Sequence, residues 1–341
     1  MEKMRLGRTD LMVSRSGFGA LPIQRVDTET VTEILQAAVD KGINFFDTAR
    51  NYSDSEEKIG RALSHVRQDI IIATKTHAPD RGTLFKDLET SLQNLKTDYI
   101  DIYQLHAPRI LPDPNDPDSL YGGLLEAQKK GMIRFIGITN HRLDVAMDAA
   151  RSEKYDTVQF PFSSISAEKD LELVETCRER DLGFIAMKAL SGGLITNAAS
   201  TFAFLRELGN IVPIWGIQHM SELEEFIAFE NSPPLLDEKM WEVINKDRAE
   251  LAGNFCRGCG YCMPCPEEIL IQHSARMDML LKRAPYQNFI TDRWKGWMDR
   301  IENCTECEEC KEKCPYELDT PKLLKYQLEN YRKFYADHVQ G

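Results

Sequence analysis

The chain between residues 16 and 230 alternates short apolar runs with longer amphipathic stretches. Eight of these runs are rich in Ile, Val and Phe and are bounded by polar or glycine-containing segments. Apolar runs of this length predict buried strands. The predicted strands cover residues 16–19, 43–48, 70–75, 99–106, 133–139, 157–162, 183–188 and 211–217.

The stretches between the runs have helical spacing. In residues 28–42 the apolar positions are 31, 34, 35, 38 and 39, and Gly42 is suited to end the helix. Residues 169–183 repeat this design. Strands that alternate with helices predict parallel βαβ units, and eight of them predict an α/β fold, a (β/α)₈ TIM barrel. An open doubly wound sheet is the alternative, but the segment SGFGALP lacks the G-x-G-x-x-G turn of such sheets.

The pattern changes after residue 230. A Pro-Pro pair opens residues 231–251, which then read as a helix, and we predict a linker there between a barrel domain of residues 1–230 and a second domain of residues 252–341. The second domain contains no alternating strand pattern, and residues 320–339 predict a helix with a Thr-Pro start. We therefore expect a mainly helical C-terminal domain.

The charge balance excludes some classes of partner. Lys and Arg total 42 and Asp and Glu total 54, a net charge of −12, which argues against nucleic acid and against an anionic membrane surface. The N-terminus does not have the pattern of a signal peptide, and no apolar run approaches the ~20 residues of a membrane span. We expect a cytoplasmic protein.

Polar residues stand at the ends of three successive predicted strands. Asp47 ends the second strand, with Tyr52 in the loop that follows, Lys75 ends the third and His106 the fourth. Because the chemistry of a (β/α)₈ barrel takes place at the C-terminal ends of its strands, we predict that the four side chains meet at one mouth. Taken one at a time, each residue has an ordinary explanation. Asp47 could cap a turn, Tyr52 could be a surface aromatic, Lys75 could be a solvated charge, and His106 could be a histidine of the core. Their joint occurrence favours a site.

This set of groups suits carbonyl reduction. Hydride addition builds charge on the carbonyl oxygen, so a proton donor must be present. A phenol has a pKa near ~10, which a nearby ammonium lowers. We expect Lys75 to lower the pKa of Tyr52, Asp47 to hold Lys75 charged, and His106 to orient the carbonyl oxygen.

Three segments resemble the signature segments of the aldo-keto reductase superfamily: FFDTARNYSDSEEKIGRAL (45–63), IIATKTH (71–77) and IDIYQLHAP (100–108). LGRTDLMVSRSGFGA (6–20) resembles the N-terminal hairpin and first strand of the same family. The resemblance covers residues 4–230. It implies an NAD(P)H-dependent oxidoreductase acting on a small carbonyl or alcohol, with a catalytic tetrad of Asp47, Tyr52, Lys75 and His106.

The same resemblance implies a nicotinamide site. Thr139, Asn140 and Gln159 would hold the carboxamide, and Met187 stands where the family has an aromatic ring stacked on the nicotinamide. The loop Leu190, Ser191, Gly192 and Gly193 would wrap the pyrophosphate, because glycine lets backbone N–H groups approach closely. An ordinary βα loop is the alternative.

Nucleotide preference is expected from the eighth strand and its loop. Gly216 and Glu222 align with the positions where NADP-binding members of the family carry Lys and Arg. A carboxylate repels a 2′-phosphate and accepts hydrogen bonds from a ribose diol. We therefore expect NAD(H) rather than NADP(H).

Eight of the nine cysteines fall in two tight groups, each followed by proline. Such clustering is typical of metal ligands, whereas a secreted disulfide protein scatters its cysteines. The second group has the C-x₂-C-x₂-C-x₃-C-P spacing of two-cluster bacterial ferredoxins, and the first is one residue shorter. The groups are Cys256, Cys259, Cys262 and Cys265, and Cys304, Cys307, Cys310 and Cys314.

The resemblance to those ferredoxins implies two [4Fe–4S] clusters, with the fourth cysteine of each run bound to the other cluster. Cys265 would then join the second group and Cys314 the first. The helical insert of residues 266–303 resembles helical dicluster ferredoxins. A pair of zinc Cys₄ sites and a single cluster are the alternatives. Cys177, alone in a predicted helix, is expected to be a buried small hydrophobe.

The fusion poses a chemical question, because nicotinamide moves two electrons as hydride, a cluster normally passes one, and no flavin motif is present. We favour a nicotinamide-dependent carbonyl reductase whose clusters serve structure or redox control. A second hypothesis is electron delivery to the barrel from a ferredoxin or flavoprotein partner. A third is an electron-transfer protein whose barrel is only a docking scaffold.

Overall fold

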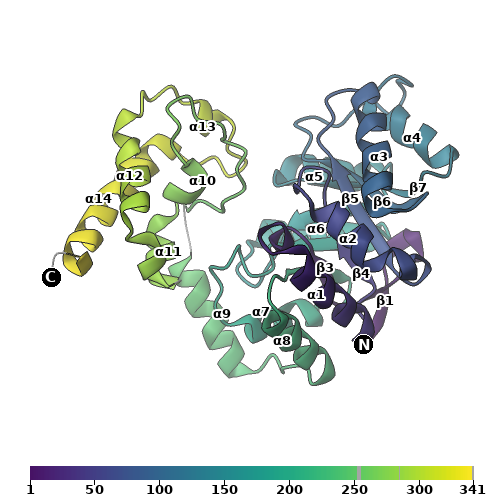
Figure 1. Cartoon of the computed structure of the whole chain (residues 1–341), viewed down its shortest axis with the longest axis horizontal. Coiled ribbons are helices and arrows are strands. Elements are labelled where there is room, and N and C mark those ends of the chain that lie inside the picture. Colours follow the sequence, from purple (N-terminus) through teal and green to yellow (C-terminus); the bar gives the residue numbers. More distant parts are fainter. Residues whose placement is uncertain (252–254, 284, 340–341) are drawn as a thin grey trace. The chain divides into compact units, whose positions relative to one another are not determined.

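The computed structural model describes residues 1–251, 255–283 and 285–339, so the domain boundary expected at residue 252 lies outside the described residues. The chain forms two compact units (Figure 1). One comprises Met1–Ala189 and Ala199–Trp241, and the other comprises Leu190–Ala198 and Glu242–Gly341. The second unit thus includes a short segment from the middle of the sequence.

The first unit contains a closed barrel of parallel strands in the order β10-β3-β4-β5-β6-β7-β8-β9. Each predicted strand has a counterpart, which confirms the barrel and excludes the open sheet. The strands are β3 (Gly17–Gly19), β4 (Phe45–Asp47), β5 (Ile71–Thr76), β6 (Ile100–His106), β7 (Ile133–Thr139), β8 (Thr157–Pro161), β9 (Gly183–Met187) and β10 (Ile211–Gly216).

Helices alternate with these strands. The first begins where the Asp27 side chain accepts a hydrogen bond from the Thr30 amide at 2.9 Å, and ends just before Gly42, whose φ of 95° suits glycine. The helices are α1 (Thr28–Asp40), α2 (Ser55–Leu63), α3 (Arg81–Leu95), α4 (Leu120–Lys129), α5 (Leu143–Ser152), α6 (Glu168–Glu179), α7 (Ala198–Glu207) and α8 (Met220–Asn231).

An antiparallel hairpin of β1 (Lys3–Arg5) and β2 (Met12–Ser14) precedes the barrel. Its buried residues pack with the apolar residues inside the barrel at the end where the strands begin. One end of the barrel is therefore filled by hydrocarbon, and the polar residues stand at the other end. The members of this cluster are Leu6, Leu11, Val13, Phe45, Ile71, Ala73, Ile102, Ile185, Val212 and Ile214.

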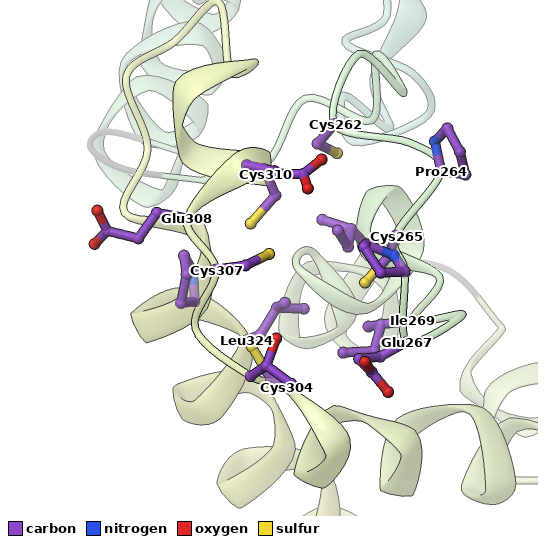
Figure 2. A pocket seen from close by; sticks show the side chains of 15 residues that line it. Cys262, Pro264, Cys265, Glu267, Ile269, Cys304, Cys307, Glu308, Cys310 and Leu324 are labelled. Atoms are coloured by element: carbon purple, nitrogen blue, oxygen red, sulfur yellow. The ribbon is translucent and has the colours of Figure 1, made fainter.

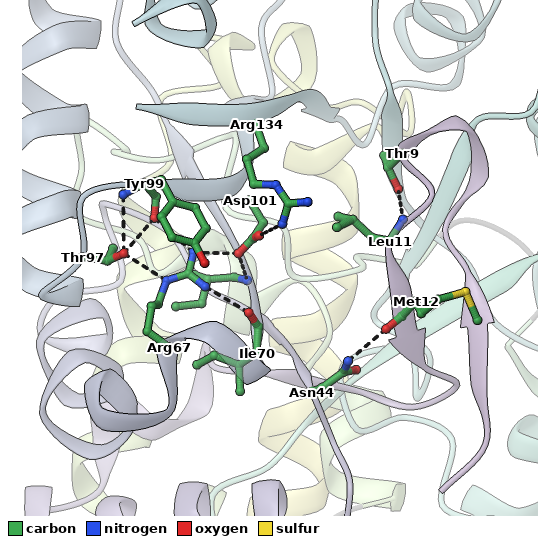
Figure 3. A network of polar contacts seen from close by, with 11 residues as sticks. Thr9, Leu11, Met12, Asn44, Arg67, Ile70, Thr97, Tyr99, Asp101 and Arg134 are labelled. Atoms are coloured by element: carbon green, nitrogen blue, oxygen red, sulfur yellow. Dashed lines mark hydrogen bonds and ion pairs between the residues drawn. The ribbon is translucent and has the colours of Figure 1, made fainter. Parts of the chain in front are cut away.

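A buried ionic network lies near the start of β6 (Figure 3). Asp101 accepts hydrogen bonds from Arg67 at 2.7 Å and from Arg134 at 2.6 Å. A third bond, 2.9 Å long, comes from the Ile72 amide. Asp101 is fully buried and Arg67 is 6% exposed. The network links β5, β6 and β7 at the end of the barrel opposite the C-terminal ends of the strands.

The second unit is built from helices. They pack around an apolar core that includes Met277, Met298, Leu324 and Tyr331. The long α14 has the bounds predicted from the sequence. No helix within the described ranges is long and apolar enough to cross a membrane. Beyond α9 (Glu238–Glu250), which connects the units, the helices are α10 (Ile271–Ser274), α11 (Met277–Arg283), α12 (Asp292–Asp299), α13 (Glu309–Glu312) and α14 (Thr320–Val339).

Candidate functional site

A buried ion pair lies at the C-terminal ends of β4 and β5. Lys75 Nζ donates to Asp47 Oδ1 at 2.7 Å and to the Thr48 carbonyl at 2.5 Å. Both charged side chains are at most 3% exposed. Burial raises the pKa of Asp47 and lowers the pKa of Lys75, while the charge of each opposes the shift of the other. The strand itself runs one residue past Lys75, to Thr76.

Tyr52 lies beside this pair. Its ring centroid is 5.2 Å from Lys75 Nζ, and its edge faces the His106 ring with centroids 6.1 Å apart. The pKa of Tyr52 is raised above its ordinary value by desolvation, and the Asp47 carboxylate adds to this rise. The expectation that Lys75 lowers the pKa of Tyr52 is therefore wrong for this structure. Desolvation and the Asp47 charge together outweigh any effect of the ammonium, which is hydrogen-bonded to Asp47 and Thr48.

His106 ends β6, and a second histidine covers its ring. The rings of His77 and His106 are stacked with centroids 3.8 Å apart and planes 14° apart. The pKa of His106 lies well below its usual value, chiefly through desolvation and also through the positive charges of Lys75, His77 and His141. Within the described residues, His106 Nδ1 is buried without a hydrogen-bond partner. The imidazole is thus neutral at pH 7.

The sequence reasoning missed His77. The available signal was its place two residues after Lys75, because side chains two apart along a strand share a face. It also missed Gln104, two residues before His106. Gln104 Nε2 donates to Gln159 Oε1 at 2.8 Å and to Asp47 Oδ2 at 3.3 Å. Gln159 Nε2 in turn donates to Asp47 Oδ1 at 3.3 Å. The two amides therefore link a predicted nicotinamide contact to the buried ion pair.

Glu56 is a third residue that the sequence reasoning did not single out. It is 1% exposed on α2, and its Oε1 accepts hydrogen bonds from Thr74 and Ser91, each at 2.7 Å. Arg50 forms an ion pair with its other oxygen. Its signal was a carboxylate at a core-facing helical position. These contacts join α2 and α3 to β5 at Thr74, the residue before Lys75. Glu56 therefore supports the strand that carries Lys75 and is not itself part of the site.

Three of the predicted nicotinamide contacts lie on neighbouring strands. Thr139 is in register with His106 on one side and Gln159 on the other. Its hydroxyl lies 3.8 Å from the sulfur of Met187, at the end of β9. Asn140 follows Thr139 and is fixed by its own contacts: its Nδ2 donates to the Pro108 carbonyl at 2.8 Å, and its Oδ1 accepts from the Arg142 amide at 2.9 Å. The structure thus brings these residues to the mouth that holds His106.

Gly216 and Glu222 lie at the end of β10 and in the first turn of α8. Gly216 is exposed. Glu222 Oε2 accepts hydrogen bonds from the amides of Gln218 at 2.7 Å and His219 at 3.0 Å. The carboxylate therefore caps the helix, as a glutamate three residues after a cap often does. One of its oxygens is committed to this role.

Leu190, Ser191 and Gly192 are assigned to a different unit from the other predicted nucleotide contacts. They belong to the second unit, whereas Thr139, Asn140, Gln159, Met187, Gly216 and Glu222 lie in the barrel unit. Ser191, Gly192 and Gly193 have consecutive left-handed φ values of 52°, 66° and 86°. Such a run suits glycine, and the Gly193 amide donates within the loop to the Leu190 carbonyl at 3.0 Å.

The cysteines of the second unit line two cavities. The first is lined by Cys256, Cys259, Cys262 and Cys314 together with apolar side chains. The second is lined by Cys265, Cys304, Cys307 and Cys310, and also by Cys262 (Figure 2). The fourth cysteine of each run therefore lies in the cavity of the other run.

These cavities fit a sulfur-ligated group. Burial raises the pKa of Cys256 and Cys310, and raises that of Cys262 to about 12. A metal must displace those protons, and soft thiolates suit iron–sulfur clusters. The Gly258 amide donates to Cys256 Sγ at 3.4 Å, a contact suited to a thiolate. Across the described ranges, no three His, Cys, Asp or Glu side chains are arranged around a single ion. Cys177 is fully buried in α6.

Two protein-family models match separate parts of the chain. Residues 16–203, more than half of the chain, match the model of the aldo/keto reductase family. Residues 255–319 match the model of the 4Fe-4S dicluster domain. The chain therefore belongs to the aldo/keto reductase family of oxidoreductases and carries an iron–sulfur domain after its barrel.

Characterised and uncharacterised relatives match a part of the chain. The uncharacterized oxidoreductase YqkF of Bacillus subtilis (strain 168) is 30% identical over 210 residues, covering 58% of this chain and 67% of the relative. The NADH-specific methylglyoxal reductase of Escherichia coli (strain K12) is 28% identical over 226 residues, covering 58% and 69%. The solved structure of aldo-keto reductase AKR11C1 from Bacillus halodurans (holo form) has a TM-score of 0.64 at 23% identity, covering 72% of this chain and 96% of that one.

Proposed function

We propose that the chain reduces a small carbonyl compound with a nicotinamide nucleotide, or oxidises the corresponding alcohol, at the mouth of its barrel. The observation that carries this proposal is the buried Lys75–Asp47 pair with Tyr52 and the neutral His106 beside it. The reaction adds a hydride to the carbonyl carbon and a proton to its oxygen, and the nicotinamide is oxidised. When bound, the reduced nicotinamide supplies the hydride.

In this proposal the residues of the chain orient the substrate and supply the proton. The raised pKa keeps the Tyr52 phenol protonated, so a proton is available when charge develops on the carbonyl oxygen. His106, held neutral, donates a hydrogen bond to the same oxygen. Lys75 places a positive charge beside the phenol ring and stabilises the phenolate left behind, and Asp47 holds Lys75 in place.

For the nucleotide, we propose that Thr139, Asn140 and Gln159 hold the carboxamide and that Met187 lies against the ring. The loop Leu190, Ser191 and Gly192 binds the pyrophosphate. NAD(H) is the proposed nucleotide, because Gly216 and Glu222 supply no cation for a 2′-phosphate. The NADH specificity stated for the Escherichia coli relative is in line with this.

For the iron–sulfur domain we propose two [4Fe–4S] clusters with crossed ligation. Cys256, Cys259, Cys262 and Cys314 would hold one, and Cys304, Cys307, Cys310 and Cys265 the other, since the members of each set line a common cavity and only Cys262 lines both. The clusters serve one-electron transfer or redox control. We place the protein in the cytoplasm, where its cysteines stay reduced.

The proposal is tested with the anaerobically purified, cluster-loaded protein. Oxidation of NADH and of NADPH is followed at 340 nm with methylglyoxal and a panel of simple aldehydes, for wild type and Tyr52→Phe. We expect NADH-dependent turnover in wild type and almost none in the variant. If wild type binds neither nucleotide in fluorescence titrations, the proposal is wrong.

A second candidate function is electron exchange between the clusters and a ferredoxin or flavoprotein. The exposure of Cys307 favours it, because a surface ligand brings its cluster within reach of a partner. Anaerobic titration with NADH, followed by visible bleaching and electron paramagnetic resonance, distinguishes the candidates. Cluster reduction by NADH alone would join barrel and clusters in one path. Reduction only by added flavoprotein supports a partner, and reduction by neither points to a structural or sensory role.

A further inference from the structure

The connection between β9 and α7 is part of the iron–sulfur unit by its contacts. Leu190–Ala198 clusters with the C-terminal residues and not with the barrel from which the chain emerges. Within the loop, the amides of Gly193 and Ile195 both donate to the Leu190 carbonyl, at 3.0 and 3.2 Å. The left-handed Ser191 is strained at its φ of 52°. The shape of this loop therefore depends on residues outside it.

Arg276 joins the loop to the first cysteine group. Its Nη2 donates to the Gly192 carbonyl at 3.0 Å. Its Nη1 lies so close to Gly258 that a Cβ there would approach within 2.6 Å, and a Cβ on Gly192 would approach within 3.2 Å. Gly258 donates its amide to Cys256 Sγ. One guanidinium, only 8% exposed, thus packs against both the cysteine loop and the glycine loop.

The charge of Arg276 needs a counter-charge in this position. A buried guanidinium is costly unless it faces negative charge. Gly258, which packs against this guanidinium, donates its amide to Cys256 Sγ, so a Cys256 thiolate would supply negative charge beside this loop. Ligation of iron makes that thiolate permanent. Arg276 is therefore best held when Cys256 is a cluster ligand.

A second arginine fixes the far end of the same loop. Arg283 Nη1 donates to the Leu194 carbonyl at 2.7 Å and to Asp247 Oδ1 at 2.8 Å. Arg276 precedes α11 and Arg283 is its last residue. The short helix thus fastens the loop at two points, and only the first of these adjoins a cysteine loop.

We propose that Arg276 is a positioning residue that couples cluster occupancy at Cys256 to the conformation of the Leu190–Ala198 loop. With the cluster in place, the fixed Gly258 and the Cys256 thiolate hold the guanidinium against Gly192. Without it, the carbonyl of Gly192 loses its donor and the loop is free to rearrange. A second consequence rests on the proposed function, in which this loop binds the pyrophosphate: loss of the cluster also weakens nucleotide binding.

Hydrogen–deuterium exchange of the full-length, cluster-loaded protein tests the coupling. We compare peptides covering residues 190–198 in wild type, Arg276→Met and Arg276→Lys. Arg300→Met is the matched control, because among the described residues the Arg300 side chain pairs with the exposed Glu268 alone, at 3.2 Å. We expect Arg276→Met to speed exchange in this loop about tenfold, the effect of losing a charged hydrogen bond. Arg300→Met should leave the loop unchanged.

Iron and sulfide content is measured for every variant. Wild type is also compared before and after removal of the clusters with a chelator, so a variant that fails to load its clusters does not decide the question. Unchanged exchange in residues 190–198 after cluster removal overturns the coupling. Faster exchange there, but no NADH binding by wild type, keeps the coupling and refutes the proposed function. If the coupling and the proposed function are both correct, the Kd for NADH should rise about tenfold in Arg276→Met.

Discussion

The imidazole of His77 lies flat on the imidazole of His106, with ring centroids 3.8 Å apart and planes 14° apart. The stack restricts the rotation of His106 at the end of β6. It also places a second titratable ring beside the first, which disfavours protonation of His106. His77 is therefore expected to act on the substrate only through His106.

Loss of the stack should weaken, but not abolish, turnover. We expect His77→Ala to lower kcat/KM for an aldehyde by about 2- to 10-fold, the worth of one aromatic pair. His77→Phe keeps a ring in place and should recover most of the loss. Steady-state kinetics and the pH profile of kcat/KM check this. If both variants match His106→Ala, His77 has a direct role of its own.

Removal of the Tyr52 hydroxyl should affect the chemical step. Tyr52→Phe keeps the ring over Lys75 but removes the proton donor, so we expect kcat to fall by about 10²- to 10⁴-fold. The Kd for NADH should stay near that of wild type. Single-turnover kinetics and fluorescence titration separate the two effects. A variant with normal kcat would assign the proton donor to another group.

The partly buried His106 makes stability depend on pH. The folded pKa of His106 lies below the ordinary 6.5 of the unfolded chain. Above pH 6.5 both states are neutral at this site. As the pH falls below 6.5, the unfolded chain binds a proton that the folded chain refuses, so the free energy of unfolding falls until the pH passes the folded pKa.

Urea unfolding of His106→Gln should show a weaker dependence on pH than wild type between about pH 5.5 and pH 8. The exposed His65 provides the control, since His65→Gln should keep the wild-type dependence. The pKa of His77 is lowered as well, chiefly by desolvation, so part of the dependence persists in the first variant. Equal slopes for all three proteins would contradict the assignment.

The ionic network around Asp101 should matter for stability and not for chemistry. Asp101→Ala leaves Arg67 buried without its carboxylate, and we expect a loss of about 3–5 kcal/mol in the free energy of unfolding. Asp181→Ala removes a partner of Arg5 from an exposed pair and should cost far less, because solvent screens that pair. Denaturant titration compares the two. Asp101→Ala should retain its NADH Kd under conditions in which it is folded.

Crossed ligation makes a prediction about Cys265. Because Cys265 lines the cavity of the second cysteine group, Cys265→Ser should disturb that cluster and spare the one held by Cys256, Cys259, Cys262 and Cys314. Iron content should fall by up to about half. Cys177→Ser, in the barrel, should keep full iron. Loss of all iron in Cys265→Ser would mean that the clusters do not assemble independently.

Much of this architecture was readable from local pattern. The strand and helix periods predicted the barrel, because eight βα repeats leave few other ways to bury their apolar faces. Asp47, Lys75 and His106 could be placed at strand ends from the sequence alone. The cysteine spacing likewise identified the iron–sulfur region, since ligand intervals are set by short-range geometry.

Other features were decided only by the tertiary structure. The direction of the Tyr52 pKa shift depends on its desolvation and on the nearby Asp47 carboxylate, and spacing along the chain does not report this. The capping role of Glu222 was open until α8 placed its carboxylate over two amides. The bond from Arg276 to Gly192 joins residues 84 positions apart. The sequence pattern determines which faces of the strands and helices are apolar and where the cysteines are spaced as ligands. The electrostatic environment of each ionisable group and the contacts between distant residues arise only when the chain has folded.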